Sequence, residues 1–245
     1  MCTVSIIPLP GDAIRLACNR DELLTRPTAL APQVIHFGQR RVIMPVDPSS
    51  GGTWIAVNDA GLIFAMLNRN TPAFALSDSS RRSRGNIIPE LVHLDEIDEV
   101  TANTIDPLEF NPFRLLIAST ARVVELTSDG REVQRSVWAH TDFPLMFTSS
   151  GLGDERVERP RRDLFDQLLR RQDVTCQDRF HRHSWPGNLH LSVCMRRTDA
   201  RTVSYTTVTL GSDRATLRYR PDAPDIDCSG ADSAHSLPLH SLSAL

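Results

Sequence analysis

Short apolar runs separated by turn residues dominate the first third of the chain. Two pairs of such runs flank Pro-Gly-Asp and Asn-Asp-Ala-Gly turns: residues 2–8 with 13–18, and residues 53–57 with 62–68. Turn formers between two apolar runs are typical of β-hairpins. The pattern therefore predicts two hairpins, the first of them at the start of the chain.

Two segments change to helical spacing. In residues 86–104 and 155–171, apolar side chains recur every three or four positions, as on one face of an amphipathic helix. The remaining apolar runs predict strands, and the runs at 113–118 and 121–127 predict a third hairpin. These runs lie at 113–118, 121–127, 191–196, 202–210 and 215–220.

The order of these elements indicates the fold class. Hairpins are interrupted by two helical blocks and no regular alternation of strand and helix occurs, which favours an α+β fold with antiparallel sheets. We expect residues 1–225 to form a single domain. Residues 226–245 are rich in Ser, Ala and His without a clear period, so we expect a disordered tail there.

Composition excludes several partners. The formal net charge is -3 and charged residues make up 23% of the chain, so no basic field points to nucleic acid. No apolar run approaches the roughly 18 residues that span a bilayer. The N-terminus shows no signal-peptide pattern, and we therefore expect a cytoplasmic protein.

The basic residues and the cysteines narrow the chemistry further. All 27 basic residues are arginine, which excludes a phosphate-binding-loop lysine, a Schiff-base lysine and a Ser-Lys dyad. The five cysteines are odd in number and include no C-x-x-C, so neither a disulfide framework nor a cysteine zinc site is expected. We expect no cofactor and no metal.

The chain begins Met1-Cys2. Removal of Met1 would give Cys2 both a thiol and a free α-amine, with pKa values of about 8.5 and 7.7 that allow proton exchange near neutral pH. The amine could then act as the general base for its own thiol. The alternative is that Cys2 is a core residue at the start of a strand.

Asn19-Arg20-Asp21-Glu22 ends the first predicted hairpin. Antiparallel pairing would return these residues to the N-terminus. Arg20 could lower the pKa of the Cys2 thiol, and Asp21 could hold the α-ammonium. The alternative is a solvated turn with a surface ion pair.

Several short motifs together resemble the NRDE family, which includes the transport and Golgi organisation protein 2 group. The resemblance is dense over residues 1–90 and weaker beyond. It implies a four-layer αββα sandwich of the N-terminal-nucleophile hydrolase type. The motifs are Met1-Cys2-Thr3, Asn19-Arg20-Asp21-Glu22, Arg26-Pro27-Thr28, Gly51-Gly52-Thr53-Trp54, Gly61 with Leu67-Asn68, and Ser83-Arg84-Gly85.

The N-terminal pattern is also similar to the choloylglycine hydrolase and penicillin V acylase family. That similarity implies catalytic roles for Cys2, Arg20, Asp21 and Asn68. Ser149 stands where those enzymes have a second Asn that helps to bind the oxyanion. A late Arg is also expected, with Arg201 as the best match and Arg197 as a competitor.

These resemblances imply two functions. The first is hydrolysis of a C–N bond in a small molecule by Cys2. The second is a non-catalytic module that binds haem, a lipid or an acyl compound on the same fold. No oligomeric state follows from the sequence.

Three histidines, His181, His183 and His190, lie within ten residues. They lack a Cys or carboxylate partner at a familiar metal-binding spacing. We interpret residues 176–190 as a loop or lid instead, and expect it, with loop 69–82, to set specificity.

Overall fold

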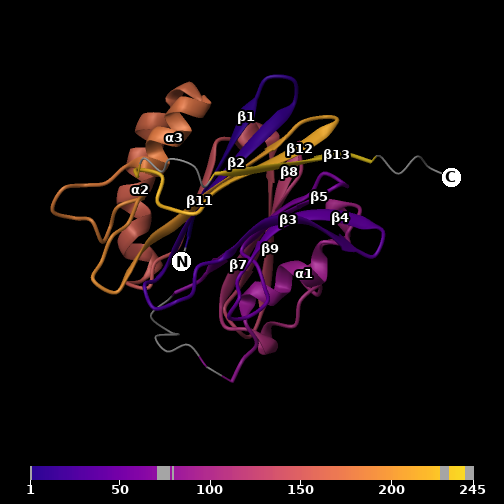
Figure 1. The fold of residues 1–245 in the computed structure, drawn as a ribbon, viewed down its shortest axis with the longest axis horizontal. Helices are drawn as coiled ribbons and strands as arrows, with labels where there is room; N and C mark the ends of the chain where they lie inside the picture. The colour runs from indigo at the N-terminus through magenta and orange to yellow at the C-terminus, as the bar shows by residue number, and fades with distance from the viewer. Residues whose placement is uncertain (1, 71–77, 79, 227–231, 241–245) are drawn as a thin grey trace.

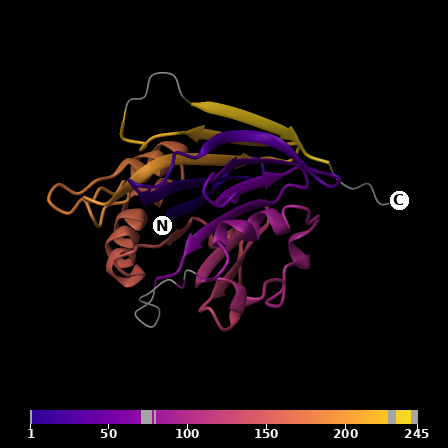
Figure 2. The same cartoon turned by 60° about the horizontal axis from the view of Figure 1, so that its bottom comes forward.

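Two antiparallel sheets stacked face to face form the centre of the protein. The computed structural model describes residues 2–70, 78, 80–226 and 232–240. Over this part of the chain, one sheet has six strands in the order β10-β1-β2-β11-β12-β13, and the other has seven in the order β3 to β9. Figure 2 shows the two sheets lying between helical segments.

The six-stranded sheet combines the two ends of the chain. Its strands are β1 (Cys2–Leu9), β2 (Ala13–Leu23), β10 (Leu145–Thr148), β11 (Ala200–Leu210), β12 (Arg214–Arg220) and β13 (Ser233–Pro238). The seven-stranded sheet is a continuous meander. Its strands are β3 (Leu30–Phe37), β4 (Arg40–Val46), β5 (Ile55–Asn58), β6 (Ile63–Asn68), β7 (Phe113–Ala118), β8 (Arg122–Ser128) and β9 (Val133–Ala139).

The helices cover the outer faces of the two sheets (Figure 1). On the six-stranded sheet lie α2 (Asp154–Leu168) and α3 (Val174–Arg182), and on the seven-stranded sheet lies the short α1 (Ile87–Leu91) with 3-10 turns at Arg84–Asn86, Ile97–Glu99 and Pro107–Glu109. Further 3-10 turns occur at His140–Asp142 and Leu169–Arg171.

Three buried clusters mark the three interfaces between these layers. The largest lies between the sheets and includes Ile14, Ile55 and Leu217. A second joins the seven-stranded sheet to α1 and includes Phe64 and Ile88. The third joins the six-stranded sheet to α2 and α3 through residues such as Phe165 and Phe180. The predicted four-layer α+β arrangement is confirmed, although the α1 layer is thin.

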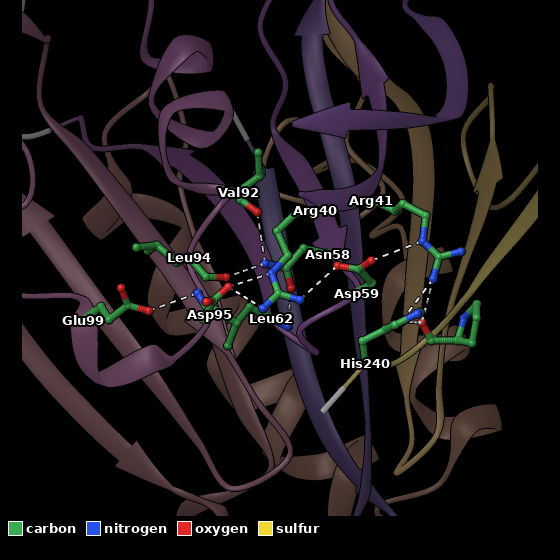
Figure 3. A network of polar contacts seen from close by, with 11 residues as sticks. Arg40, Arg41, Asn58, Asp59, Leu62, Val92, Leu94, Asp95, Glu99 and His240 are labelled. Carbon is green, nitrogen blue, oxygen red and sulfur yellow. Dashed lines mark hydrogen bonds and ion pairs between the residues drawn. The ribbon is translucent and has the colours of Figure 1, made fainter. Parts of the chain in front are cut away.

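Figure 3 shows how one end of the β5–β6 turn is anchored. The Asn58 side chain donates to the carbonyls of Val92 and Leu94, at 3.0 and 2.9 Å, and accepts from the Leu62 N–H at 2.9 Å. Asp59 accepts from Arg40 and Arg41, and its carbonyl accepts from the backbone of His240. The turn thereby links α1, β4 and the residues that follow β13.

The structure confirms the three predicted hairpins. It corrects the predictions for residues 86–104, 176–190, 191–196 and part of the tail. Residues 191–196 form an irregular segment, buried from Ser192 to Met195, rather than a strand, because their backbone bonds to Arg161 of α2 and to His183, which follows α3. Only a short part of 86–104 is helical. Residues predicted as a loop at 176–190 belong to α3 as far as Arg182.

The tail prediction for 226–245 is wrong for Ser233–Pro238. These residues form β13, which pairs antiparallel with β12. Only Leu237 among them is fully buried, so the segment lacks the apolar alternation that marks a strand, and backbone pairing with β12 defines it instead. The predictions for 227–231 and 241–245 lie outside the described residues. The single-domain interpretation of 1–225 stays a prediction.

A close backbone approach beside the sheets gives the first testable prediction. A Cβ atom on Gly52 would lie 2.4 Å from the Gly85 carbonyl carbon, in a backbone pair fixed by the Thr53 N–H donating to the Gly85 carbonyl at 2.9 Å. Gly52→Ala should therefore lower the free energy of unfolding by about 1–3 kcal/mol. Urea denaturation measures this change. Gly211→Ala is the control, because its nearest neighbour would lie 3.7 Å away; an equal loss in both variants would contradict the prediction.

Candidate active site

The alternation of side chains at the end of β2 divides the Asn19–Glu22 motif between two faces of the sheet. Asn19 faces the helices, where its amide donates to the carbonyls of His181 and Val193 at 2.9 and 3.0 Å. Arg20 and Glu22 face a cleft on the other side. Successive side chains of a strand point to opposite faces, so one motif supplies both an anchor and a cleft wall.

Cys2 lies directly opposite Arg20 in the β1–β2 register. The predicted return of this motif to the N-terminus is therefore confirmed. Only 4% of the surface of Cys2 is exposed. Cys2 lines a cleft of about 470 Å³, whose walls also include Arg20, Trp54 and Asn68. The first residue of β1 is thus both packed and accessible from one side.

The Cys2 thiol has a pKa below its usual range. The chief cause is a hydrogen bond with the thiol of Cys18, and burial opposes the shift. The positive charge of Arg20 lowers the pKa too, but it is a smaller cause than Cys18. The pKa of Cys18 is raised well above its usual range by the same hydrogen bond and by burial, so the pair favours a thiolate on Cys2.

Ser149 holds the main-chain nitrogen of Cys2. Its hydroxyl accepts from the Cys2 nitrogen at 3.1 Å, and its own N–H donates to the Cys2 carbonyl at 2.9 Å. Ser149 is fully buried and does not line the cleft. The oxyanion contact expected of Ser149 stays a prediction; in this structure both of its donors face the Cys2 carbonyl.

Arg20 is fixed by a charged network along the cleft wall. Its guanidinium donates to Asp47 at 2.7 Å and to Glu22 at 3.2 Å, and it lies 4.3 Å from the centre of the Trp54 ring. Arg26 donates to the same Asp47 oxygen at 2.8 Å. A planar cation held by two carboxylates and an aromatic face has little rotational freedom.

Asp21 lies on the opposite face from Arg20, with 1% of its surface exposed. Burial raises its pKa, against the opposing charge of Arg161 and a hydrogen bond of 2.6 Å donated by Thr202. Asp21 is also close enough to act on the pKa of Cys2. This carboxylate therefore lies on the helix side of the sheet, near Cys2 but outside the cleft.

Arg161 is a fully buried cation that the sequence analysis missed. Its side chain extends from α2 and donates to the hydroxyls of Thr3 and Thr148, at 2.8 and 2.6 Å. It also donates to the carbonyls of Leu191 and Ser192. Burial lowers its pKa, and the charge of Asp21 opposes that shift. The charges of Arg161 and Asp21 thus stabilise each other behind β1 and β10.

Asn68 occupies the predicted position at the end of β6 and lines the cleft with Cys2. Its side chain has no hydrogen-bond partner among the residues that the structure describes, which leaves its amide available to a ligand. Arg201 does not line the cleft; it is half-exposed and lies 3.9 Å from Asp222. Its competitor Arg197 lines the cleft instead, because the segment before β11 folds back over this edge.

The three clustered histidines have separate environments. His181 is buried and bonds to Ser5 and Asn19, and burial lowers its pKa to about 3. The ring of His183 packs against Trp185, whereas His190 lines a separate hollow near Arg196. Within the described part of the chain, no group of three or more His, Cys, Asp or Glu residues is arranged to hold a metal ion.

Comparison with known proteins identifies the family. The family model described as Transport and Golgi organisation 2 matches residues 1–187. The chain belongs to this family. No curated protein matches the sequence, and over the described residues no helix is long and apolar enough to cross a membrane.

Solved structures extend the likeness of this Transport and Golgi organisation 2 family member to N-terminal-nucleophile hydrolases. An N-acylethanolamine-hydrolyzing acid amidase orthologue of Caenorhabditis elegans has a TM-score of 0.57 at 12% identity, covering 93% of this chain and 95% of that one. A mutant conjugated bile acid hydrolase of Clostridium perfringens has a TM-score of 0.57 at 10% identity, covering 96% and 92%. At these identities the likeness shows the fold.

Several cleft residues of this family member had a sequence signal without an assigned role. Trp54, Arg26 and Arg84 belong to motifs that carried the family resemblance, and the structure brings all three to the cleft. Asp47 and Cys18 had no such signal. Their importance depends on strand register and long-range packing, which a local pattern does not specify.

The Cys18 contact makes a prediction for this Transport and Golgi organisation 2 family member. Cys18→Ala removes the largest cause of the low Cys2 pKa, so alkylation of Cys2 by limiting iodoacetamide at pH 7 should slow, by about tenfold for each unit that the pKa rises. Peptide mapping over time measures the rate. Arg20→Ala should slow it less, and Cys176, whose pKa is raised by burial and by Asp173, is the internal reference. A rate in Cys18→Ala equal to that of the wild type would contradict the assignment.

Proposed function

We propose that this protein is an N-terminal-nucleophile hydrolase that cleaves the C–N bond of a small amide, with Cys2 as the nucleophile after removal of Met1. One observation carries the proposal. Cys2 combines a lowered thiol pKa with a single open side that faces a cleft. A buried structural cysteine normally has its thiol pKa raised by burial, as Cys194 does, at about 12.

The reaction begins with transfer of the Cys2 thiol proton to its own α-amine. The thiolate attacks the acyl carbon, and the tetrahedral adduct collapses when the ammonium returns this proton to the leaving amine. The acyl group then remains on the sulfur as a thioester. Water attacks the thioester with the α-amine as general base, which releases the acid and restores the thiol.

The surrounding residues divide these tasks. The Ser149 hydroxyl, 3.1 Å from the Cys2 nitrogen, accepts a hydrogen bond from the amine and orients it. Asp21 stabilises the ammonium by its charge. Asn68, with its free amide at the cleft, binds the carbonyl oxygen of the substrate as negative charge develops there. Arg197, rather than Arg201, is the late arginine that contacts substrate.

The fold neighbours support the reaction class. Both are named for hydrolysis, one of N-acylethanolamines and one of conjugated bile acids. Those activities belong to those proteins, and the substrate of this chain follows from its own cleft.

The first test is mass spectrometry of the intact protein made in cells. The protein should lack Met1, and incubation with a panel of N-acyl aminocoumarins should add the mass of one acyl group and release fluorescence. Cys2→Ala should abolish both, with a rate loss of about 10³-fold or more, whereas the control Cys176→Ala should retain them. Retention of Met1 would rule out this mechanism. A saturable haem Soret shift that depends on Cys2, without turnover, would favour the binding alternative.

A second test separates charge from shape at Asp21. Asp21→Asn keeps the side-chain shape and an oxygen for the Thr202 hydroxyl, so the protein should still fold, with a lower urea midpoint because the buried Arg161 loses an opposing charge. The rate of acyl release should fall by about 10²-fold, the scale of lost acid–base assistance. Asp178→Asn is the control, a carboxylate on the same side of the sheet that pairs with Arg15. Full activity in Asp21→Asn, or its unfolding, would show that the assigned role is wrong.

A further inference from the structure

The charges that line the cleft do not balance. Arg20, Arg26 and Arg84 face the two carboxylates Glu22 and Asp47, so three cations share two anions. Arg197, at the edge of the same cleft, has its own partner in Asp199, with a nitrogen–oxygen distance of 3.1 Å. The excess positive charge therefore belongs to the group of three.

Arg20 and Arg26 take up both carboxylates. Arg20 lies 2.7 Å from Asp47 and 3.2 Å from Glu22, and Arg26 lies 2.8 and 3.6 Å from the same two side chains. Each carboxylate is thus shared by two guanidinium groups, and neither has an oxygen within ion-pair distance of Arg84.

Arg84 is the guanidinium left over. Its Nη1 donates to the carbonyl of Pro112 at 2.9 Å, and in the described part of the chain no carboxylate lies within 4.0 Å of it. Burial lowers its pKa, and the negative charge of Glu22 opposes this shift. An arginine stays charged at any ordinary pH and presents five N–H donors in a fixed fork. Arg84 lines the cleft, and the bond to Pro112 is the one side-chain hydrogen bond that it makes to the described residues.

The backbone on both sides of Arg84 is held by hydrogen bonds next to the cleft wall. The Ser83 hydroxyl accepts from the Gly85 N–H at 3.3 Å, and the Gly85 carbonyl accepts from Thr53, next to Trp54. The absence of a side chain on Gly52 allows this close approach. The turn that carries Arg84 is therefore tied to the segment whose tryptophan covers Arg20.

We propose that Arg84 is the specificity residue of the cleft and binds an anionic oxygen group, carboxylate or phosphate, carried by the substrate. This inference rests on the proposed function, since it names the class of amide that Cys2 cleaves: one with an acid group attached near the scissile bond. A partly buried cation without a counterion is costly, and a bidentate oxyanion removes that cost while it orients the substrate.

Binding without turnover tests this inference separately from catalysis. Cys2→Ala protein is titrated calorimetrically with N-benzoylglycine, its methyl ester and benzoylaminomethylphosphonate, three probes that share one benzamide core. The acid should bind at least about tenfold more tightly than the neutral ester, the gain expected of one charge-assisted pair. The phosphonate arm distinguishes a preference for phosphate from one for carboxylate.

Substitutions in the same background locate the effect. Arg84→Gln should remove the preference for acid over ester, and Arg84→Lys, which keeps the charge but loses the fork, should retain part of it. Arg179→Gln, an exposed arginine on α3, should keep all of it. Equal binding of acid and ester, or a preference that survives Arg84→Gln in protein with an unchanged urea midpoint, would overturn the assignment. An Arg84-dependent preference in a protein that never acylates Cys2 would instead refute only the hydrolase proposal.

Discussion

The pairing of β2 with both β1 and β11 is the constraint on which the site depends. It sets Cys2 opposite Arg20 on one side and Thr202 opposite Asp21 on the other. The register with β11 shifts between Thr202 and Ser204, a bulge at the point where the two faces of β2 carry different charges. Bulges re-aim side chains without breaking a sheet, and here Thr202 is left bonded to Asp21.

Two charge systems lie back to back across β2. In front, Arg20 is held by Asp47, Glu22 and Trp54 at the cleft. Behind the sheet, burial disfavours the charged forms of Asp21 and Arg161, and the charge of each residue opposes this effect in the other. Because the sheet separates them, the front system lines the cleft while the rear one, through Arg161, ties β1 and β10 to α2.

Local pattern predicted what depends on neighbours in sequence. The first hairpin, and with it the approach of Arg20 to Cys2, followed from two apolar runs and a turn. The family resemblance added Asn68, whose position at a strand end is local too. Ser149, Arg197 and Cys18 act through contacts between distant segments, so the sequence pattern gave either no role or a different one. The sequence pattern did not predict β13, because one buried side chain, Leu237, does not make an alternating apolar pattern.

The distances along the chain between Cys2 and its neighbours have a consequence for the timing of assembly. Ser149, which holds the Cys2 nitrogen, lies 147 residues away, and Thr202, which bonds to Asp21, lies 181 residues from it. Pairings of such separation form late, when most of the chain has left the ribosome. The surroundings of Cys2 are therefore completed only after the chain as far as β11 is available to fold, although β1 and β2 themselves are joined by a short local turn.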